Sequence, residues 1–188
     1  MNAPSHPTRS LSDCLLRPES VAIVGASANL KKNNSRPQRF LEKHGFPGAV
    51  YPINPGYETL FDAPCYPDLD SVAGQVEHAY VMTPTASIES VVDQCVAAGV
   101  RCASIFTGGF AETGPEGEAM QHRLVEKAAA GGLRLLGPNS LGVINTRHPM
   151  TLSANAVPAR DSVPAGRIGL VSQSGSLIGA LVSRGQAR

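Results

Sequence analysis

The chain has 188 residues, of which 42% are apolar and 16% charged, and 16 basic against 15 acidic side chains give a net charge of +1. This composition is typical of a globular protein, and the charge balance argues against a nucleic-acid or membrane-surface partner. No window reaches the ~18 consecutive apolar residues of a membrane span, and the polar N-terminus does not resemble a signal peptide.

Short apolar runs bounded by turn residues recur along the chain. Residues 1–10 are polar, so we expect a disordered tail there, followed by a short helix over 11–17. Runs that are apolar on both faces are typical of strands in a parallel sheet covered on both sides. The predicted strands cover residues 21–25, 49–53, 79–82, 103–106, 133–136 and 168–171.

The segments between these runs have helical periodicity. Apolar residues from Ile88 to Val96 follow the helical spacing, and Gly99 gives a stop signal. Thr113 with Glu116, and Ser35 with Gln38, have the spacing of capping boxes, which predicts helices running to about residue 130 and to residues 44–45.

Alternating strands and helices predict a doubly wound α/β sheet. Right-handed crossovers place the loops 25–35, 53–58, 82–86, 106–114 and 136–140 at one edge of this sheet, where a ligand should bind.

The four cysteines have no zinc-type spacing, which predicts reduced thiols in a cytoplasmic protein and no metal site. Cys95 lies on the apolar face of a predicted helix, so packing explains it.

The first strand-to-helix loop does not fit a dinucleotide. It has Gly25 but lacks the other two glycines of GxGxxG, and Asn54 stands where a ribose-binding acidic residue is expected. NAD is therefore disfavoured. Four cations, Lys31, Lys32, Arg36 and Arg39, gather in and after the loop and suit a ligand with several phosphates. A solvated basic surface is the alternative.

After Asn145 the pattern changes. Residues 146–167 contain three prolines and no clear period, which predicts a connector. The strand 168–171 and a helix over 175–184 would begin a second α/β unit. Between them, the sequence SQSGS at a helix N-terminus favours an anion, with a plain helix N-cap as the alternative.

Five motifs, in order, carry a family resemblance: VAIVGAS, FPGAVYPINP, GGFAETGPEG, LLGPNSLGVIN and GLVSQSGSL. Over about residues 15–185 the chain resembles the N-terminal part of the NDP-forming acyl-CoA synthetases and, more distantly, the succinyl-CoA synthetase alpha subunit. The resemblance implies a Rossmann-like CoA-binding domain over 11–145. It also implies the beginning of a truncated, flavodoxin-like second CoA-ligase domain over 168–188.

The resemblance also assigns binding residues. Those that would hold the CoA phosphates are Gly25, Ala26, Ser27, Lys32, Asn33 and Asn34. Ile53 and Asn54 would lie by the adenosine, and Thr83 and Pro84 by the pantetheine. The residues near the thiol would be Thr107, Gly108, Gly109 and Phe110, with Gly137, Pro138 and Asn139 closing the site. Ser174, Gly175 and Ser176 would receive the phosphate of a phosphohistidine.

The chain departs from the family pattern at three positions. Gly56 and Tyr57 follow the NP motif where relatives commonly have a lysine, so Tyr57 is a candidate to stack on adenine instead. Ser140 replaces a cysteine of the alpha subunit. The acidic residue of the succinyl type aligns with Gly108, so a succinyl substrate is not implied.

By resemblance, the family reaction converts an acid, CoA and ATP into acyl-CoA, ADP and phosphate through a phosphohistidine. That histidine lies downstream of SQSGS, and none of the five histidines here fits its role. We therefore expect no catalytic residue in this chain, which would be an inactive part of a longer synthetase. Its partners would be CoA, a carboxylic acid and an ATP-grasp domain or subunit that binds ATP or ADP; a homo-oligomer stays open. The alternatives are a stand-alone CoA-binding sensor or carrier module and, more remotely, an NAD-binding regulator.

Overall fold

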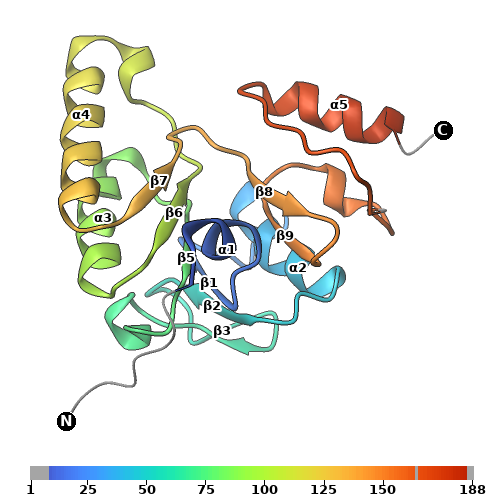
Figure 1. The fold of residues 1–188 in the computed structure, drawn as a ribbon. Coiled ribbons are helices and arrows are strands. Elements are labelled where there is room, and N and C mark those ends of the chain that lie inside the picture. Colours follow the sequence, from blue (N-terminus) through green and yellow to red (C-terminus); the bar gives the residue numbers. More distant parts are fainter. Residues whose placement is uncertain (1–8, 164, 186–188) are drawn as a thin grey trace.

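The computed structural model describes residues 9–163 and 165–185. Its centre is a parallel sheet of β1 (Ser20–Val24), β2 (Ala49–Ile53), β5 (His78–Val81), β6 (Cys102–Ile105) and β7 (Arg134–Leu136). The strand order is β2-β1-β5-β6-β7, and all four pairings are parallel (Figure 1). The predicted Rossmann-like, doubly wound α/β fold is confirmed, and five of the six predicted strands form.

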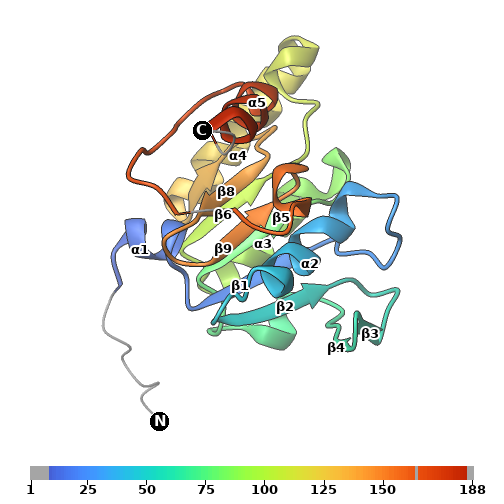
Figure 2. The same cartoon turned by 90° about the vertical axis from the view of Figure 1, so that its right-hand side faces the viewer.

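Both faces of the sheet are covered, which explains why most residues of its strands are apolar. Helices α3 (Ile88–Ala97) and α4 (Pro115–Ala130) lie on one face, and α2 (Arg36–Lys43) lies on the other (Figures 1 and 2). Alternate residues of β1 serve the two faces: Ala22 and Val24 join the cluster under α3 and α4, and Val21 and Ile23 join the cluster under α2.

The predicted N-terminal helix is α1 (Leu11–Leu16). Ser10 caps it, because its hydroxyl accepts the Asp13 N–H at 3.1 Å. Arg9 forms ion pairs with Glu19 and Glu77. The prediction of a disordered tail is therefore wrong for residues 9 and 10, while residues 1–8 lie outside the described part.

Neither predicted capping box forms. A 3₁₀ turn precedes each helix, η1 (Asn33–Ser35) before α2 and η4 (Ala111–Thr113) before α4. Within these turns the Ser35 hydroxyl donates to the Lys32 carbonyl, and the Thr113 hydroxyl donates to the Phe110 carbonyl. Each hydroxyl is oriented toward the carbonyl three residues earlier and therefore does not cap the helix by accepting one of its N–H groups.

A hairpin stands where the connector was predicted to begin. It pairs β8 (Gly142–Asn145) antiparallel with β9 (Met150–Ser153). Met150 and Leu152 are fully buried and share a core cluster with Leu41 of α2. The connector prediction is therefore wrong for this stretch, because a four-residue strand gives too short a pattern to recognise without its partner.

Side chains of α2 also hold the segment that follows the hairpin. Arg36 donates to the Ala154 carbonyl at 2.9 Å, and Lys43 donates to the Ala159 carbonyl at 2.6 Å. His44, at the C-terminal end of α2, lies with Nε2 2.7 Å from the Pro158 carbonyl oxygen. This part of the chain is bound to the domain.

The remaining short elements are surface turns and one small hairpin. The hairpin pairs β3 (Thr59–Leu60) with β4 (Ala63–Pro64). The other 3₁₀ turns are η2 (Asp70–Val72), η3 (Thr85–Ser87) and η5 (Val157–Ala159).

The predicted strand over 168–171 does not form, although the helix after it does, as α5 (Gly175–Gly185). Ile168 and Val171 are 95% and 101% exposed. Within the described residues no strand pairs with this segment, so its backbone gains nothing from an extended ladder. No helix in the described ranges combines the length and hydropathy that crossing a bilayer requires.

Candidate functional site

The loops after β1 and β5 flank the point where the strand order reverses. Chain connections leave this point in opposite directions, which opens a crevice at the carboxyl ends of the strands. Gly25 ends β1 with φ +85°, and a Cβ on it would lie 3.1 Å from the Met82 carbonyl carbon and oxygen. Glycine is therefore needed both for the backbone turn and for the close approach of the two loops.

Asparagine side chains fix the first loop. Asn34 Nδ2 donates to the Gly25 carbonyl at 2.6 Å, and Asn54 Nδ2 donates to the Ala26 carbonyl at 2.7 Å. The Ser27 hydroxyl accepts the Asn29 N–H at 3.1 Å. The structure thus gives Asn34 and Asn54 a positioning role in shaping the loop.

Burial limits what several predicted residues can offer. Ala26, Ser27 and Ile53 are buried at 1%, 6% and 3% exposure. Phe110 is fully buried in the core cluster under α3 and α4. The expectation that Phe110 lies near the thiol therefore concerns its backbone, because the apolar ring fills the core.

The basic residues of the first loop divide into two groups. Lys31 and Lys32 are exposed, and neither forms an ion pair with another described residue. Arg36 instead donates to the Ala154 carbonyl. Of the four predicted cations, Lys31 and Lys32 in the loop and Arg39 on α2 are exposed, while Arg36 is engaged in holding the chain.

The loops after β5, β6 and β7 are tied together by hydrogen bonds. Thr107 Oγ1 donates to the Thr83 carbonyl at 2.6 Å, and the Asn139 N–H donates to the Thr107 carbonyl at 3.1 Å. The Thr83 hydroxyl is enclosed and has no hydrogen-bond partner among the described residues. The structure thus brings the predicted residues near the pantetheine and the thiol into one cluster, next to the cis peptide Gly137–Pro138.

Glu112 belongs to this cluster, although the sequence motifs did not predict it as a site residue. Its Oε1 accepts the Gly109 N–H at 2.6 Å, and this bond holds the pKa of the carboxyl below its usual range. The side chain is exposed. The signal was present in GGFAETGPEG, where an acidic residue stands three positions after a glycine and can accept its N–H.

The SQSGS motif forms the N-terminus of α5, where the Ser174 hydroxyl accepts the Leu177 N–H at 3.3 Å. A groove of about 470 Å³ lies beside it. The groove wall includes Asn33 and Arg36 near the first loop and Gly175 and Ser176 of α5. Predicted residues that are about 140 positions apart in the sequence therefore line one groove.

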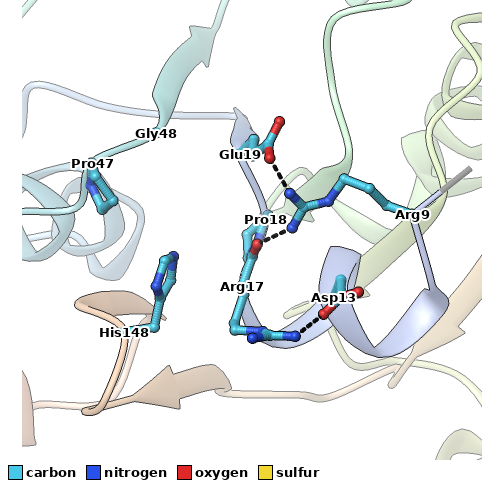
Figure 3. A pocket seen from close by; sticks show the side chains of 8 residues that line it. All are labelled: Arg9, Asp13, Arg17, Pro18, Glu19, Pro47, Gly48 and His148. Carbon is cyan, nitrogen blue, oxygen red and sulfur yellow. Dashed lines mark hydrogen bonds and ion pairs between the residues drawn. The ribbon is translucent and has the colours of Figure 1, made fainter. Parts of the chain in front are cut away.

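A second cavity of about 470 Å³ lies at the opposite edge of the sheet, before the amino ends of β1 and β2 (Figure 3). Its cations are already paired, Arg9 with Glu19 and Glu77, and Arg17 with Asp13. His148 completes the wall. Because the charges are matched within the protein, this cavity offers no net attraction to an anionic ligand.

One histidine and the four cysteines are packed in the core. His78 is fully buried with Nε2 2.8 Å from the Ser104 hydroxyl, and burial lowers its pKa to about 4. All four cysteines are buried, and burial raises the pKa of each thiol. In the described ranges no group of three or more His, Cys, Asp or Glu side chains is arranged to hold a metal ion.

Comparison with known proteins agrees with this geometry. The sequence profile described as "CoA binding domain" matches residues 19–146. The chain is 32% identical over 168 residues to acetate–CoA ligase [ADP-forming] II of Archaeoglobus fulgidus, covering 89% of this chain and 24% of the relative. It is 35% identical over 169 residues to the alpha subunit of acetate–CoA ligase [ADP-forming] I of Pyrococcus furiosus, covering 88% and 36%.

A solved structure gives the same result. The dinucleotide forming acetyl-coenzyme A synthetase 1 of Candidatus Korarchaeum cryptofilum superposes with a TM-score of 0.85 at 35% identity, covering 92% of this chain and 36% of that one. The chain thus spans about a quarter to a third of the length of these relatives.

Proposed function

The chain belongs to the CoA binding domain family, and from that premise we propose that it holds coenzyme A for an ADP-forming acyl-CoA synthetase. The relatives reported above are ADP-forming ligases or a synthetase of acetyl-coenzyme A. We assign the use of ATP, the phosphohistidine and the activation of the acid to the parts of such an enzyme that these relatives contain and that this chain does not cover.

The observation that carries the proposal is the pair of loops at the strand-order reversal. The loop after β1 is fixed by Asn34 and Asn54 and carries the exposed Lys31 and Lys32. A preorganised loop with two cations suits the phosphates of the CoA nucleotide, because the charges are placed before the ligand arrives.

The pantetheine arm would then run along the loops after β5, β6 and β7. The enclosed Thr83 hydroxyl supports this path, since an unpaired buried hydroxyl is costly and can turn toward a ligand amide. The thiol would end near Gly108 and Gly109, with the loop 137–139 beside it. Ser174, Gly175 and Ser176 would hold a phosphate at the N-terminus of α5.

A stand-alone CoA sensor or carrier is less well supported. The similarity to the ADP-forming ligases extends over 88% to 93% of the chain, well beyond the residues 19–146 of the CoA-binding family match. The buried, unreactive thiols fit the reducing environment of the cytoplasm, which we propose as its location.

Calorimetric titration with CoA and with NAD tests the proposal. We expect CoA to bind with a micromolar dissociation constant, about −8 kcal/mol, and NAD not to bind. Binding of CoA without NAD supports the site. Binding of NAD at similar strength, or of neither ligand, contradicts it.

A further inference from the structure

The peptide group between Gly108 and Gly109 is held by side chains on both sides. Its carbonyl accepts the Thr85 hydroxyl at 2.8 Å, and its N–H donates to Glu112 Oε1 at 2.6 Å. Thr85 comes from η3 before α3, and Glu112 comes from η4 before α4. Two separate elements therefore fix the orientation of one peptide group at the place assigned to the CoA thiol.

The same geometry fixes the Glu112 carboxylate. A Cβ at position 108 would lie 3.0 Å from Glu112 Oε1 and 3.9 Å from Asn139 Oδ1. The φ of Gly108 is not in the left-handed region. A side chain at position 108 would therefore press on the Glu112 carboxylate in its present position. Gly108 and Glu112 lie in contact on the surface of the site.

The charge of Glu112 is not neutralised within the described part of the chain. Its carboxylate accepts the backbone N–H of Gly109, and none of the ion pairs found among the described residues includes it. The side chain is exposed. A charge that is exposed, oriented and unpaired acts on whatever is bound next to it.

We propose that Glu112 is a specificity-determining residue that disfavours acyl groups ending in a second carboxylate. This inference rests on the proposed function, which places the CoA sulfur, and therefore the acyl group attached to it, beside Gly108. A neutral acyl group meets no penalty there. A dicarboxylic acyl group brings a second negative charge toward the Glu112 carboxylate, and two like charges in contact repel each other.

The test compares acetyl-CoA with succinyl-CoA, two thioesters that differ in the terminal carboxylate. Calorimetric titration of the chain with CoA, acetyl-CoA and succinyl-CoA is repeated for Glu112→Gln. Glutamine keeps an oxygen that can accept the Gly109 N–H and removes only the charge. Glu126→Gln, at an exposed position in the C-terminal half of α4, is the matched control for loss of one negative charge.

We expect the unaltered chain and Glu126→Gln to bind acetyl-CoA about fivefold more tightly than succinyl-CoA at low ionic strength, as expected for one repulsion between two carboxylates in contact with water. Glu112→Gln should bind the two thioesters about equally and keep its affinity for CoA. If the ratio of the two affinities is unchanged in Glu112→Gln while CoA still binds, the specificity role is refuted and the proposed function stands. If the unaltered chain does not bind CoA, both fall, and that titration alone shows it.

Discussion

Replacing Gly25 with alanine tests the junction at the centre of the proposed site. The change adds one methyl group where φ is +85° and where the new Cβ would lie 3.1 Å from backbone atoms of Met82 and from Thr83 Cγ2. Two separate costs arise, one from the backbone conformation and one from the contact.

The magnitude follows from these two costs. A left-handed conformation costs a non-glycine residue roughly 1–2 kcal/mol, and overpacking against a backbone that cannot rotate away costs about 1–3 kcal/mol more. We expect Gly25→Ala to lower the free energy of unfolding by about 2–5 kcal/mol in total, and to weaken CoA binding at least tenfold because the loops after β1 and β5 separate.

Gly45 supplies the matched control. Its φ is +70°, and a Cβ there would meet no atom within 4 Å. Gly45→Ala therefore has the conformational cost without the contact. Urea denaturation followed by circular dichroism gives the stability of both variants, and calorimetry gives their CoA affinity. Equal destabilisation by the two substitutions, or unchanged CoA affinity in Gly25→Ala, would refute the close-approach argument.

Three further predictions concern the phosphates, the hairpin and the buried histidine. Lys32→Ala should weaken CoA binding and reduce the dependence of binding on salt. Lys43→Ala is the control and should change neither, because the Lys43 amine is engaged with a backbone carbonyl. Equal effects of the two substitutions in titrations at several salt concentrations would contradict the loop assignment. Leu152→Ala should destabilise the fold by about 2–5 kcal/mol in urea denaturation, and half-exposed Leu177→Ala by less than about 1 kcal/mol, so similar costs would mean that β9 is not core. The pKa of His78 is lowered to about 4 from 6.5, so the unfolded chain takes up a proton before the folded chain as pH falls, and the free energy of unfolding should drop by about 3 kcal/mol between pH 6.5 and 4. His78→Gln should flatten this part of the plot of unfolding free energy against pH. An unchanged plot would show that the folded protein protonates His78 normally.

The five central strands and the helices between them could be predicted because their patterns are local and complete. Each strand lies in a mostly apolar run, and the turn residues at its ends are next to it in the sequence. The order of strand and helix then restricts the sheet to a few topologies, and the site edge follows from the topology.

The failed predictions concern residues whose role depends on a distant partner. Ser35 and Thr113 have capping-box spacing, yet each hydroxyl bonds inside a 3₁₀ turn. Met150 and Leu152 become core because α2 lies over them. The segment 168–171 has the apolar run of a strand but has no strand beside it in the described part of the chain.

The candidate site shows the same division. The motifs placed Gly25, Thr83, Thr107 and Asn139 at one edge, and the structure brings them there. The motifs placed Phe110 near the thiol without indicating that its ring is buried, and they did not single out Glu112. Both points have one cause, since a motif gives the positions of residues but not the direction in which each side chain points.

By itself, then, the sequence determined the doubly wound sheet and the edge at which the candidate site lies, and it favoured a phosphate-rich ligand over NAD, because these inferences depend on periodicity, turn residues and charge within short stretches. Only the tertiary structure decided which polar groups are available to that ligand. Asn34, Asn54 and Arg36 donate to backbone carbonyls. Lys31 and Lys32 remain exposed, and the Glu112 carboxylate accepts the Gly109 N–H without an ion-pair partner among the described residues. A hydrogen bond depends on the distance between groups that the sequence separates, and folding alone sets that distance.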